Sequence, residues 1–393
     1  MRIGTPDLTV EKGQLIWSVA VDELAHVPHR LWFRLPETYA EMATGLADPA
    51  VIGLLLPAMH ADERIEVDGP VTDELAHNLT HGYQQILEAT IPGARQVPLD
   101  APHVVPAGNP APGVGTGFSA GIDSYAVLAE HHFSPVPNHL RLTHLTFFNV
   151  GSHNPGEEGR RLFRDRFGLL APVAEGIGLP FVPVDSNLDD FYTFGSYQLT
   201  YGPRNISAAS LLQGGLGRYY FAGSFSYAHT GVRPSHDTAF SDPISMPLLV
   251  TGQFRPNSHG NQYTRVEKTL LVADVPASHT SLNVCVTPLR DGGNCSRCPK
   301  CLRTELTLEI AGRLDEYCRV FDVDVYRSAR AAYLNRVAIE EDEFAAEIRE
   351  YARRNGFRLP SVRIARVRNG VQVANRKART LVRRVRDQLG GRG

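Results

Sequence analysis

The sequence predicts an α/β protein whose main domain is a parallel sheet with helices on both faces. Three observations lead to this prediction. Strand-like and helix-like segments alternate from Gly113 onward, a Pro- and Gly-rich stretch precedes them, and four of the five cysteines crowd between Cys285 and Cys301. Strands that alternate with helices are typical of parallel sheets. Closely spaced cysteines in a reducing compartment favour a metal site over disulfides.

The bulk composition is that of an ordinary globular protein. The 393 residues are 42% hydrophobic and 21% charged, with a formal net charge of −2. Such a length allows two to three domains, and near-neutrality gives no global field toward nucleic acid or membrane. The first residues contain no secretory signal, and no apolar run approaches the roughly 20 residues of a membrane helix. We therefore expect a cytoplasmic protein without a membrane span.

Residues 1–110 are predicted to form a small α+β domain. The segments GQLIWSVAV and HRLWFRL are rich in β-branched and aromatic residues, as strands are. Residues 72–89 place Leu75, Leu79 and Leu87 along one side of an amphipathic helix. No catalytic constellation is evident in this segment. The stretch VVPAGNPAPG then makes a natural linker.

The main domain is predicted to span residues 113–315. The expected strands are 113–119, 142–150, 181–187 and 218–226, and the expected helices are 124–129, 157–178 and 206–216. In such sheets, ligands bind beyond the carboxyl ends of the strands. The last part of the chain, 316–393, is predicted to be a helical, basic extension.

A phosphate-binding loop is predicted where the first strand of this domain passes into its helix. The segment GFSAGIDSY exposes consecutive backbone N–H groups at a small-residue turn, and the helix adds the positive end of its dipole. Ser119 and Ser124 offer hydroxyl donors, and Asp123 could help to hold Mg²⁺. A glycine-containing turn by itself is weak evidence, so a fortuitous turn is the alternative.

The order of residue types in this turn resembles a known signature. Ser119-Ala120-Gly121-Ile122-Asp123-Ser124 resembles the SGGxDS motif of the PP-loop (N-type ATP pyrophosphatase) family, and no G-K-[ST] of a Walker loop follows. The resemblance implies a Rossmann-like fold of the adenine nucleotide alpha hydrolase type, with ATP and Mg²⁺ as cofactors. Ala120 stands in place of the family's first glycine, which is unfavourable if that position needs a positive φ.

The cysteines provide the second motif. Cys285, Cys295, Cys298 and Cys301 have C-x9-C-x2-C-x2-C spacing, which suits a closed tetrahedral Zn²⁺ site with a structural role. An iron–sulfur cluster is the alternative. Cys318 is interpreted as a buried thiol on a helix.

Together, the loop and the cysteines resemble 7-cyano-7-deazaguanine synthase-like enzymes over residues 113–310. Gly202-Pro203-Arg204-Asn205, before a small-residue helix, resembles that family's P-G-R-N segment, and Tyr263-Thr264-Arg265-Val266-Glu267 resembles its T-K-x-E segment. The family's Y-P-D-C substrate segment is not reproduced, since Phe240-Ser241-Asp242-Pro243 stands in about that place. This difference favours shared chemistry on another substrate.

The resemblance implies an AMP-forming ligase. ATP would activate a carboxylate or amide oxygen of a small molecule, and ammonia or a nucleophile from a separate donor would displace AMP. The residues that would contact ATP are Phe118, Ser119, Ala120, Gly121, Ile122, Asp123, Ser124, Phe148, Asn149, Gly151 and Asn205. The catalytic residues would be Asp123, Arg204, Arg265 and Lys268, with the three basic side chains neutralising charge at the α-phosphate. Each of the three could also be an ordinary surface charge.

Two other functions stay open. Residues 361–393 carry ten Arg or Lys and a single acid, Asp387, so the tail is a candidate for RNA contact, or else a solvated helical extension. A tRNA-thiolating PP-loop enzyme is therefore one alternative, with Cys318 as the thiol left for sulfur transfer. A non-catalytic nucleotide or nucleic-acid binding module with a degenerate loop is the other. The sequence is also compatible with a homodimer.

Overall fold

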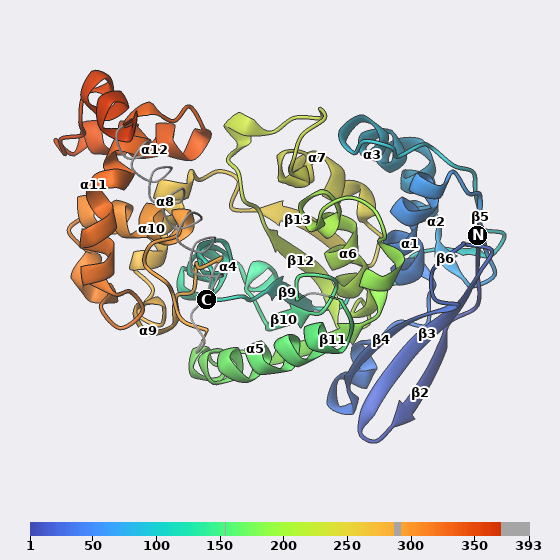
Figure 1. The fold of residues 1–393 in the computed structure, drawn as a ribbon. Coiled ribbons are helices and arrows are strands. Elements are labelled where there is room, and N and C mark those ends of the chain that lie inside the picture. The colour runs from blue at the N-terminus through green and yellow to red at the C-terminus, as the bar shows by residue number, and fades with distance from the viewer. Residues whose placement is uncertain (154, 287–291, 371–393) are drawn as a thin grey trace, which may run out of the picture. The chain divides into compact units, whose positions relative to one another are not determined.

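The computed structural model describes residues 1–153, 155–286 and 292–370 (Figure 1). Its contacts divide the chain into two compact units, Met1–Tyr263 and Thr264–Gly393. The domain boundaries predicted near residues 110 and 315 stay predictions. The predicted phosphate loop belongs to the first unit, and the four cysteines belong to the second. Among the residues that the structure describes, no helix is long and apolar enough to cross a membrane.

The first unit contains the predicted parallel sheet. Its strands are β9 (Gly113–Gly117), β10 (His144–Phe148), β11 (Phe181–Ser186), β12 (Leu216–Ala222) and β13 (Arg255–His259). All neighbouring pairs within this set are parallel, in the order β13-β12-β9-β10-β11. The four strands predicted from the sequence are confirmed, and β13 is an additional one.

Strand β9 lies where the order of the sheet reverses. The chain passes from β9 through α4 (Ile122–Leu128) to β10 and through α5 (Gly156–Ile177) to β11, and α6 (Tyr197–Leu211) then leads back to β12 on the other side of β9. Such a reversal opens a crevice beyond the carboxyl ends of the two central strands. Glycines in β9 permit close packing, because a Cβ on Gly113 would lie 2.2 Å from the Gly215 carbonyl oxygen.

Helices cover both faces of this sheet, as predicted. Adjacent residues of a strand point to opposite faces. Phe147 stacks on Phe163 of α5 with ring centroids 5.2 Å apart, whereas its neighbour Phe148 belongs to the core cluster that contains Ile206 and Ala208 of α6. Helix α5 therefore covers one face and α6 the other.

The predicted helix at 206–216 begins earlier than expected. Gly202, Pro203, Arg204 and Asn205 lie inside α6 rather than before it. Proline inside a helix removes a hydrogen bond and is locally unfavourable. The burial of α6 against α1 (Asp48–Ala61) overrides that local preference.

The N-terminal segment extends the same sheet. Its strands are β1 (Arg2–Ile3), β2 (Asp7–Glu11), β3 (Gln14–Asp22), β4 (Arg30–Pro36), β5 (Ile65–Val67) and β7 (Leu99–Asp100), while β6 (Val71–Thr72) and β8 (Val104–Val105) form a separate pair. The two predicted strands are confirmed as β3 and β4. Strand β4 pairs antiparallel with β11, with Arg34 opposite Asp185 and Phe33 opposite Ser186. Among the described residues, one 11-stranded sheet thus has the order β13-β12-β9-β10-β11-β4-β3-β1-β5-β7, and β2 pairs with β3 beside this path.

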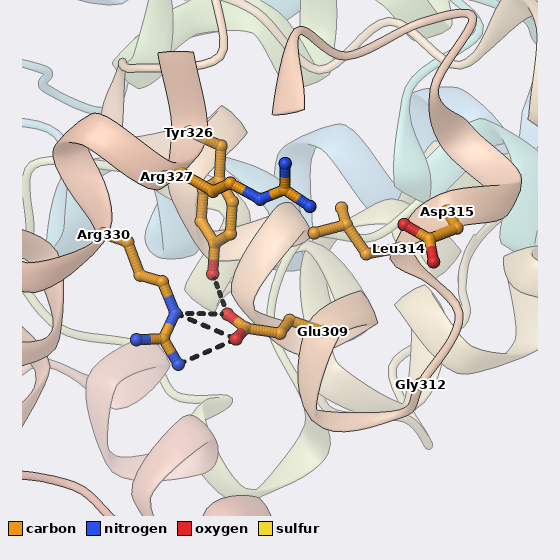
Figure 2. A pocket seen from close by; sticks show the side chains of 7 residues that line it. All are labelled: Glu309, Gly312, Leu314, Asp315, Tyr326, Arg327 and Arg330. Carbon is orange, nitrogen blue, oxygen red and sulfur yellow. Dashed lines mark hydrogen bonds and ion pairs between the residues drawn. The ribbon is translucent and has the colours of Figure 1, made fainter. Parts of the chain in front are cut away.

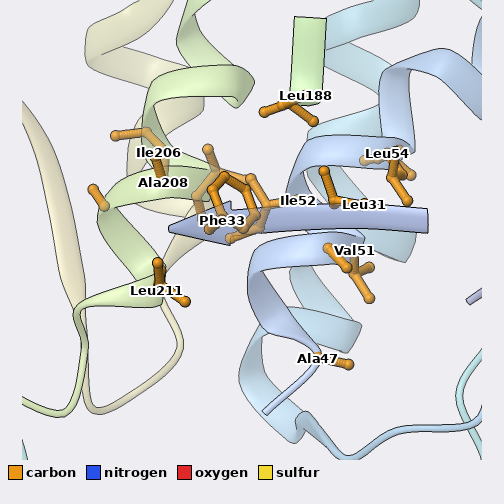
Figure 3. Close-up of a cluster of buried hydrophobic side chains, with 14 of the residues drawn as sticks. Leu31, Phe33, Ala47, Val51, Ile52, Leu54, Leu188, Ile206, Ala208 and Leu211 are labelled. Carbon is orange, nitrogen blue, oxygen red and sulfur yellow. The ribbon is translucent and has the colours of Figure 1, made fainter. Parts of the chain in front are cut away.

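The predicted N-terminal helix is confirmed as a run of three segments, α2 (Asp73–Asn78), the π-helical η2 (Leu79–Tyr83) and α3 (Gln84–Thr90). The larger helix α1 is apolar all round and buried along most of its length, as expected for a core helix. A Cβ on Gly53 would lie 2.6 Å from Ser207 Oγ, so this glycine lets α1 approach α6 closely. Figure 3 shows the core between α1, α6 and β4, with Phe33 and Ile52 at its centre.

The remaining short elements of the first unit are η1 (Glu37–Met42), η3 (Ala129–Phe133), η4 (Asn138–Leu140), η5 (Leu188–Phe191), η6 (Tyr227–His229), η7 (Thr238–Phe240), α7 (Asp242–Ser245) and η8 (Met246–Leu249). The second unit contains α8 (Arg265–Ala273), α9 (Ser278–Ser281), α10 (Pro299–Ile310), η9 (Leu314–Tyr317), α11 (Val323–Ile339) and α12 (Glu343–Arg354). Its core includes Leu306, Tyr326, Val337 and Ile348. Most of the basic tail, 371–393, lies outside the described residues.

Candidate functional site

The loop that follows β9 is the centre of the candidate site. Phe118 leaves the strand with its N–H donated to the Thr146 carbonyl oxygen at 2.9 Å. Its ring is buried against Tyr125 and Phe181. Ser119, the next residue, is exposed. The loop thus begins from a fixed aromatic anchor and turns outward at the switch point of the sheet.

Ala120 adopts a left-handed backbone conformation with φ of +57° and is buried. This is the positive φ for which the family's glycine is suited, and an alanine there is strained by roughly 1 kcal/mol. Strained backbone of this kind clusters at binding sites, where the surrounding structure enforces it. The turn is also braced by the Gly121 N–H, which donates to Ser119 Oγ at 3.4 Å.

Helix α4 begins directly after this turn. Gly121 is its N-cap and makes no side-chain capping bond. The first N–H groups of any helix have no acceptor within the helix, and they point toward the loop together with the positive end of the dipole. Ser124 Oγ donates to the Gly121 carbonyl oxygen at 3.0 Å, and Asp123 is half-buried in the first turn. The arrangement is suited to an anion.

Phe148 and Asn149 at the end of β10 were predicted to contact ATP. Asn149 is instead engaged in joining β10 to β11, because its N–H donates to the Val184 carbonyl at 2.9 Å and its Nδ2 donates to Asp185 Oδ1 at 2.7 Å. Its carbonyl accepts from Ser186 Oγ at 2.7 Å. Phe148 stacks on Tyr219. These contacts fix Phe148 and Asn149 at the carboxyl end of the sheet. Their contact with ATP stays a prediction.

Arg204 is a buried charge at the same edge of the sheet, with only 3% of its side chain exposed. Its Nη1 donates to the Val150 carbonyl at 3.2 Å and forms an ion pair with Asp189. Its guanidinium lies 3.8 Å from the centre of the Tyr192 ring. Gly151, with φ of +112°, makes room for this group, since a Cβ there would lie 2.1 Å from Arg204 Nη1.

Asn205 also makes contacts within α6. Its Nδ2 donates to Tyr197 Oη at 3.1 Å and to the Tyr201 carbonyl at 2.8 Å. Burial raises the pKa of Tyr197, so the phenol is neutral. Asn205 therefore holds two tyrosines in place, one of which, Tyr197, faces the Arg204 guanidinium.

Arg265 and Lys268 belong to α8 of the second unit. Thr264 caps that helix with a capping box completed by Glu267, and the Arg265 N–H donates to Glu347 Oε2 at 2.7 Å. Lys268 is 1% exposed and Arg265 9% exposed. The alternative that Arg204, Arg265 and Lys268 are ordinary surface charges is wrong for all three, since each is buried.

The four predicted metal ligands converge. Cys285, Cys295, Cys298 and Cys301 are buried free cysteines, and their sulfur atoms all lie within 4.8 Å of one another. Cys298 Sγ lies 3.9 Å from Cys285 Sγ and 3.5 Å from Cys301 Sγ. Four sulfurs at 2.3 Å from one tetrahedral zinc ion would be separated by ~3.8 Å. This group could therefore hold a metal ion, and its geometry is compatible with zinc.

Polar contacts prepare the cysteines for this role. Burial opposes ionisation of Cys298, but hydrogen bonds from Cys301, Val286 and Cys295 lower its pKa to about 7. Burial and the neighbouring Cys298 raise the pKa of Cys301, and binding of a metal would have to release this proton. Asn294 fixes the loop, with its Oδ1 accepting from the Val284 N–H at 2.9 Å.

The prediction that Cys318 is buried is wrong. The residue lies in a turn after η9, and its side chain is exposed. The helix expected there ends at Tyr317, whose ring occupies the core position instead.

The segment Phe240-Ser241-Asp242-Pro243, which differs from the Y-P-D-C motif of the enzymes that the sequence resembles, is folded into the core. Asp242 opens α7, is 2% exposed and accepts a hydrogen bond from Tyr201 Oη at 2.7 Å. Burial raises its pKa to about 8. The adjacent cavity, between Tyr83, Pro203 and Ser241, has a volume of about 10 Å³, which holds at most a single water. This cavity is too small for a substrate.

Two features were not anticipated from the sequence. Glu130, His131 and His259 lie together although about 130 residues separate the histidine pair, so no local spacing could have indicated them. In the second unit, a pocket of about 380 Å³ is open beside Glu309. As Figure 2 shows, Glu309 already forms an ion pair with Arg330 there and accepts a hydrogen bond from Tyr326 Oη.

A comparison with models of known protein families finds no match, and a comparison with curated protein sequences finds none either.

Proposed function

We propose that the chain is an ATP-dependent, AMP-forming ligase of the PP-loop class. It would adenylate a carboxylate or amide oxygen of a small molecule, and ammonia or another nucleophile would then displace AMP. The observation that carries the proposal is the left-handed turn at Ala120, which leads into the N-terminus of α4 at the switch point of the sheet. A glycine-rich anion loop has the same requirement for a positive φ.

The residues would divide the work as follows. The N–H groups of the loop and the hydroxyl of Ser119 would bind the pyrophosphate, and Asp123 would carry Mg²⁺. Arg204 would act as a positioning residue, because its guanidinium already binds Val150 and Asp189. Catalysis of this kind depends on placement and charge stabilisation more than on a covalent side-chain step.

The cysteine group would hold zinc as a structural ion. Four sulfurs around one centre leave no coordination position for a substrate, and the α10 helix begins at Pro299 between two of the ligands. Zinc supplies four bonds that cross-link the segment before α10 to the helix itself. An iron–sulfur cluster is the alternative occupant.

Calorimetric titration with Mg²⁺-ATP tests the proposal. Wild type should bind, whereas an Asp123→Ala, Ser124→Ala double variant should lose at least about tenfold in affinity, equal to about 1.4 kcal/mol. Asp165→Ala, which removes an exposed acid from α5, is the matched control and should bind normally. The next step is a screen of carboxylates for release of AMP and pyrophosphate. Release of ADP, or no binding of ATP by wild type, contradicts the proposal.

A tRNA-thiolating enzyme of the same class is a second candidate. The exposure of Cys318 favours it, because a sulfur carrier must reach its partner. Steeply salt-dependent binding of tRNA that is lost on deletion of residues 361–393 would support this candidate. Unchanged activity of a Cys318→Ser variant would remove the thiol from the mechanism.

A further inference from the structure

A second group of side chains that could bind a metal ion lies in the first unit. These side chains come from two elements that lie far apart in the sequence and meet in the fold. Glu130 and His131 belong to η3, the π-helical turn that continues α4, and His259 is the last residue of β13. Single π-helical turns frequently occur at functional sites, because they re-aim side chains that a regular helix would point elsewhere. We call these three residues the Glu–His–His cluster.

Three ligand atoms converge in the Glu–His–His cluster. His131 Nε2 lies 2.7 Å from His259 Nε2, and His259 Nε2 lies 2.9 Å from Glu130 Oε2. One ligand atom from each of the three residues lies within 4.8 Å of the others. Side chains from two separate elements thus present nitrogen, nitrogen and carboxylate oxygen to one point.

The tautomer of His131 follows from its other nitrogen. Its Nδ1 lies 3.0 Å from the Leu140 carbonyl oxygen, which can only accept, so Nδ1 carries the proton. The neutral ring therefore presents a lone pair at Nε2. A backbone carbonyl that fixes the tautomer in this way is the usual support of a metal-binding histidine. Tyr220 reinforces the arrangement, with its ring 4.2 Å from that of His131 and its hydroxyl donating to the same carbonyl at 3.1 Å.

His259 Nε2 then faces two acceptors, the His131 lone pair and the Glu130 carboxylate. A single shared proton satisfies this arrangement without a metal, and a divalent cation satisfies all three groups at once. Gln262 Nε2 donates to both oxygens of Glu130, at 2.9 and 3.0 Å, and holds the carboxylate toward the histidines.

The cluster is accessible on one side. His131 is buried, whereas 21% of the His259 side chain and 26% of the Glu130 side chain are exposed. A cation can therefore reach the cluster, and a water or another small ligand can complete its coordination. Two histidines with one glutamate form a set that binds zinc with an open fourth position, unlike the closed set of four cysteines.

We propose that the Glu–His–His cluster binds a zinc-class divalent cation with a position open to solvent. Zinc–nitrogen bonds are ~2.0–2.1 Å long, so tetrahedral ligation would separate the two nitrogens to about 3.3 Å, a shift of roughly half an ångström. Small changes at χ1 and χ2 of His259 accommodate this shift. The site is independent of the ligase chemistry proposed above, because none of its residues belongs to the loop after β9.

Metal counting on the full chain tests this site. Protein stripped by a chelator is reloaded with Zn²⁺ and desalted, and bound zinc per chain is measured. Wild type should retain about one equivalent more than His259→Gln, since the amide can still donate to Glu130 but is a poor zinc ligand. His139→Gln, which changes an exposed histidine of the same unit, should bind as much zinc as wild type. Equal zinc in wild type and His259→Gln overturns the proposal.

Cobalt titration of wild type gives an answer even if His259→Gln does not fold. Thiolate ligands give Co²⁺ strong sulfur-to-metal charge transfer, and nitrogen and oxygen ligands give d–d bands alone. A second equivalent that adds d–d absorption without charge transfer supports the Glu–His–His site. If all cobalt absorption saturates together with the thiolate charge-transfer bands, no second equivalent binds. The cluster is then a network that shares a proton, and the proposal is overturned.

Discussion

The methyl group of Ala120 lies in the loop after β9, at a position where the backbone is left-handed. A left-handed conformation costs alanine roughly 1 kcal/mol relative to glycine. The same methyl group is buried, which contributes about 0.8 kcal/mol. The two effects nearly cancel, so the loop keeps its shape without a glycine at this position.

This balance predicts the result of replacing Ala120. Ala120→Gly should change the free energy of unfolding by less than about 0.5 kcal/mol, because relief of strain offsets the lost methyl group. Ala126→Gly is the matched control in α4, where glycine has no strain to relieve. It should destabilise by about 2 kcal/mol, from the lost methyl group and the lower helix propensity. Urea denaturation measures both, and equal losses would contradict the left-handed assignment.

A second prediction concerns the buried charge of Arg204. Asp189→Asn removes its partner and leaves a guanidinium among tyrosines. Breaking a buried pair costs about 3–5 kcal/mol, and because a quarter of the Asp189 side chain is exposed, we expect roughly 2–3 kcal/mol. Asp190→Asn removes the same charge from the same turn at an exposed position and should cost no more than about 0.5 kcal/mol. Thermal denaturation compares the two.

A third prediction concerns pH and Asp242. Its pKa is about 8 in the folded protein, against 3.8 when unfolded, so folding takes up a proton between these values. The contribution of this carboxyl group to stability is greatest below pH ~4 and falls as the pH rises to about 8, by up to about 1.4 kcal/mol per pH unit. Asp242→Asn should remove this pH dependence, so the stability of the variant should rise relative to that of wild type as the pH rises. Parallel stability curves of wild type and variant between pH 5 and about 8 would contradict it.

At the scale of elements, the order β13-β12-β9-β10-β11 places the loop after β9 at the point where the sheet reverses. The strands and helices of this region followed from hydrophobic alternation and turn residues, and the loop from its residue order. The start of α6 at Tyr197 could not be predicted in this way. Pro203 is locally unfavourable in a helix, and only the packing of α6 on α1 overrides that preference. The Glu–His–His cluster could not be predicted either, since η3 and β13 meet only through the tertiary fold.

The cysteine segment leads to a prediction about metal removal. The four cysteines lie in the segment before α10 and in the first turn of that helix, so an ion bound by them would link the two. A strong zinc chelator should therefore release the ion and loosen the second unit, because ligand binding and local folding are coupled. Hydrogen exchange at residues 294–306 measures the loosening, with the strands of the first unit as the internal control. A brown protein that bleaches on reduction would identify an iron–sulfur cluster instead.

At the scale of the whole chain, the N-terminal segment and the parallel strands share one sheet within the first unit. This continuity could not be predicted, because the pairing of β4 with β11 joins residues about 150 positions apart that share no motif. Asn187 reinforces the junction between β4 and β11. Its side chain accepts from the Trp32 N–H at 2.9 Å and donates to the Arg30 carbonyl at 2.8 Å. The position of the four-cysteine segment in the second unit could not be predicted from local patterns either.

The pairing of β4 with β11 also determines when β4 can complete its sheet contacts during synthesis. Strand β4 leaves the ribosome early, but its partner edge exists only after β11 has been made, about 150 residues later. At 5–20 residues per second, this interval lasts roughly 8–30 seconds. During that time β4 pairs with β3 on one side only, and α1 lacks its packing partner α6, so apolar side chains stay exposed, which is the situation in which nascent chains engage chaperones. Long-range pairing of this kind also slows folding in general.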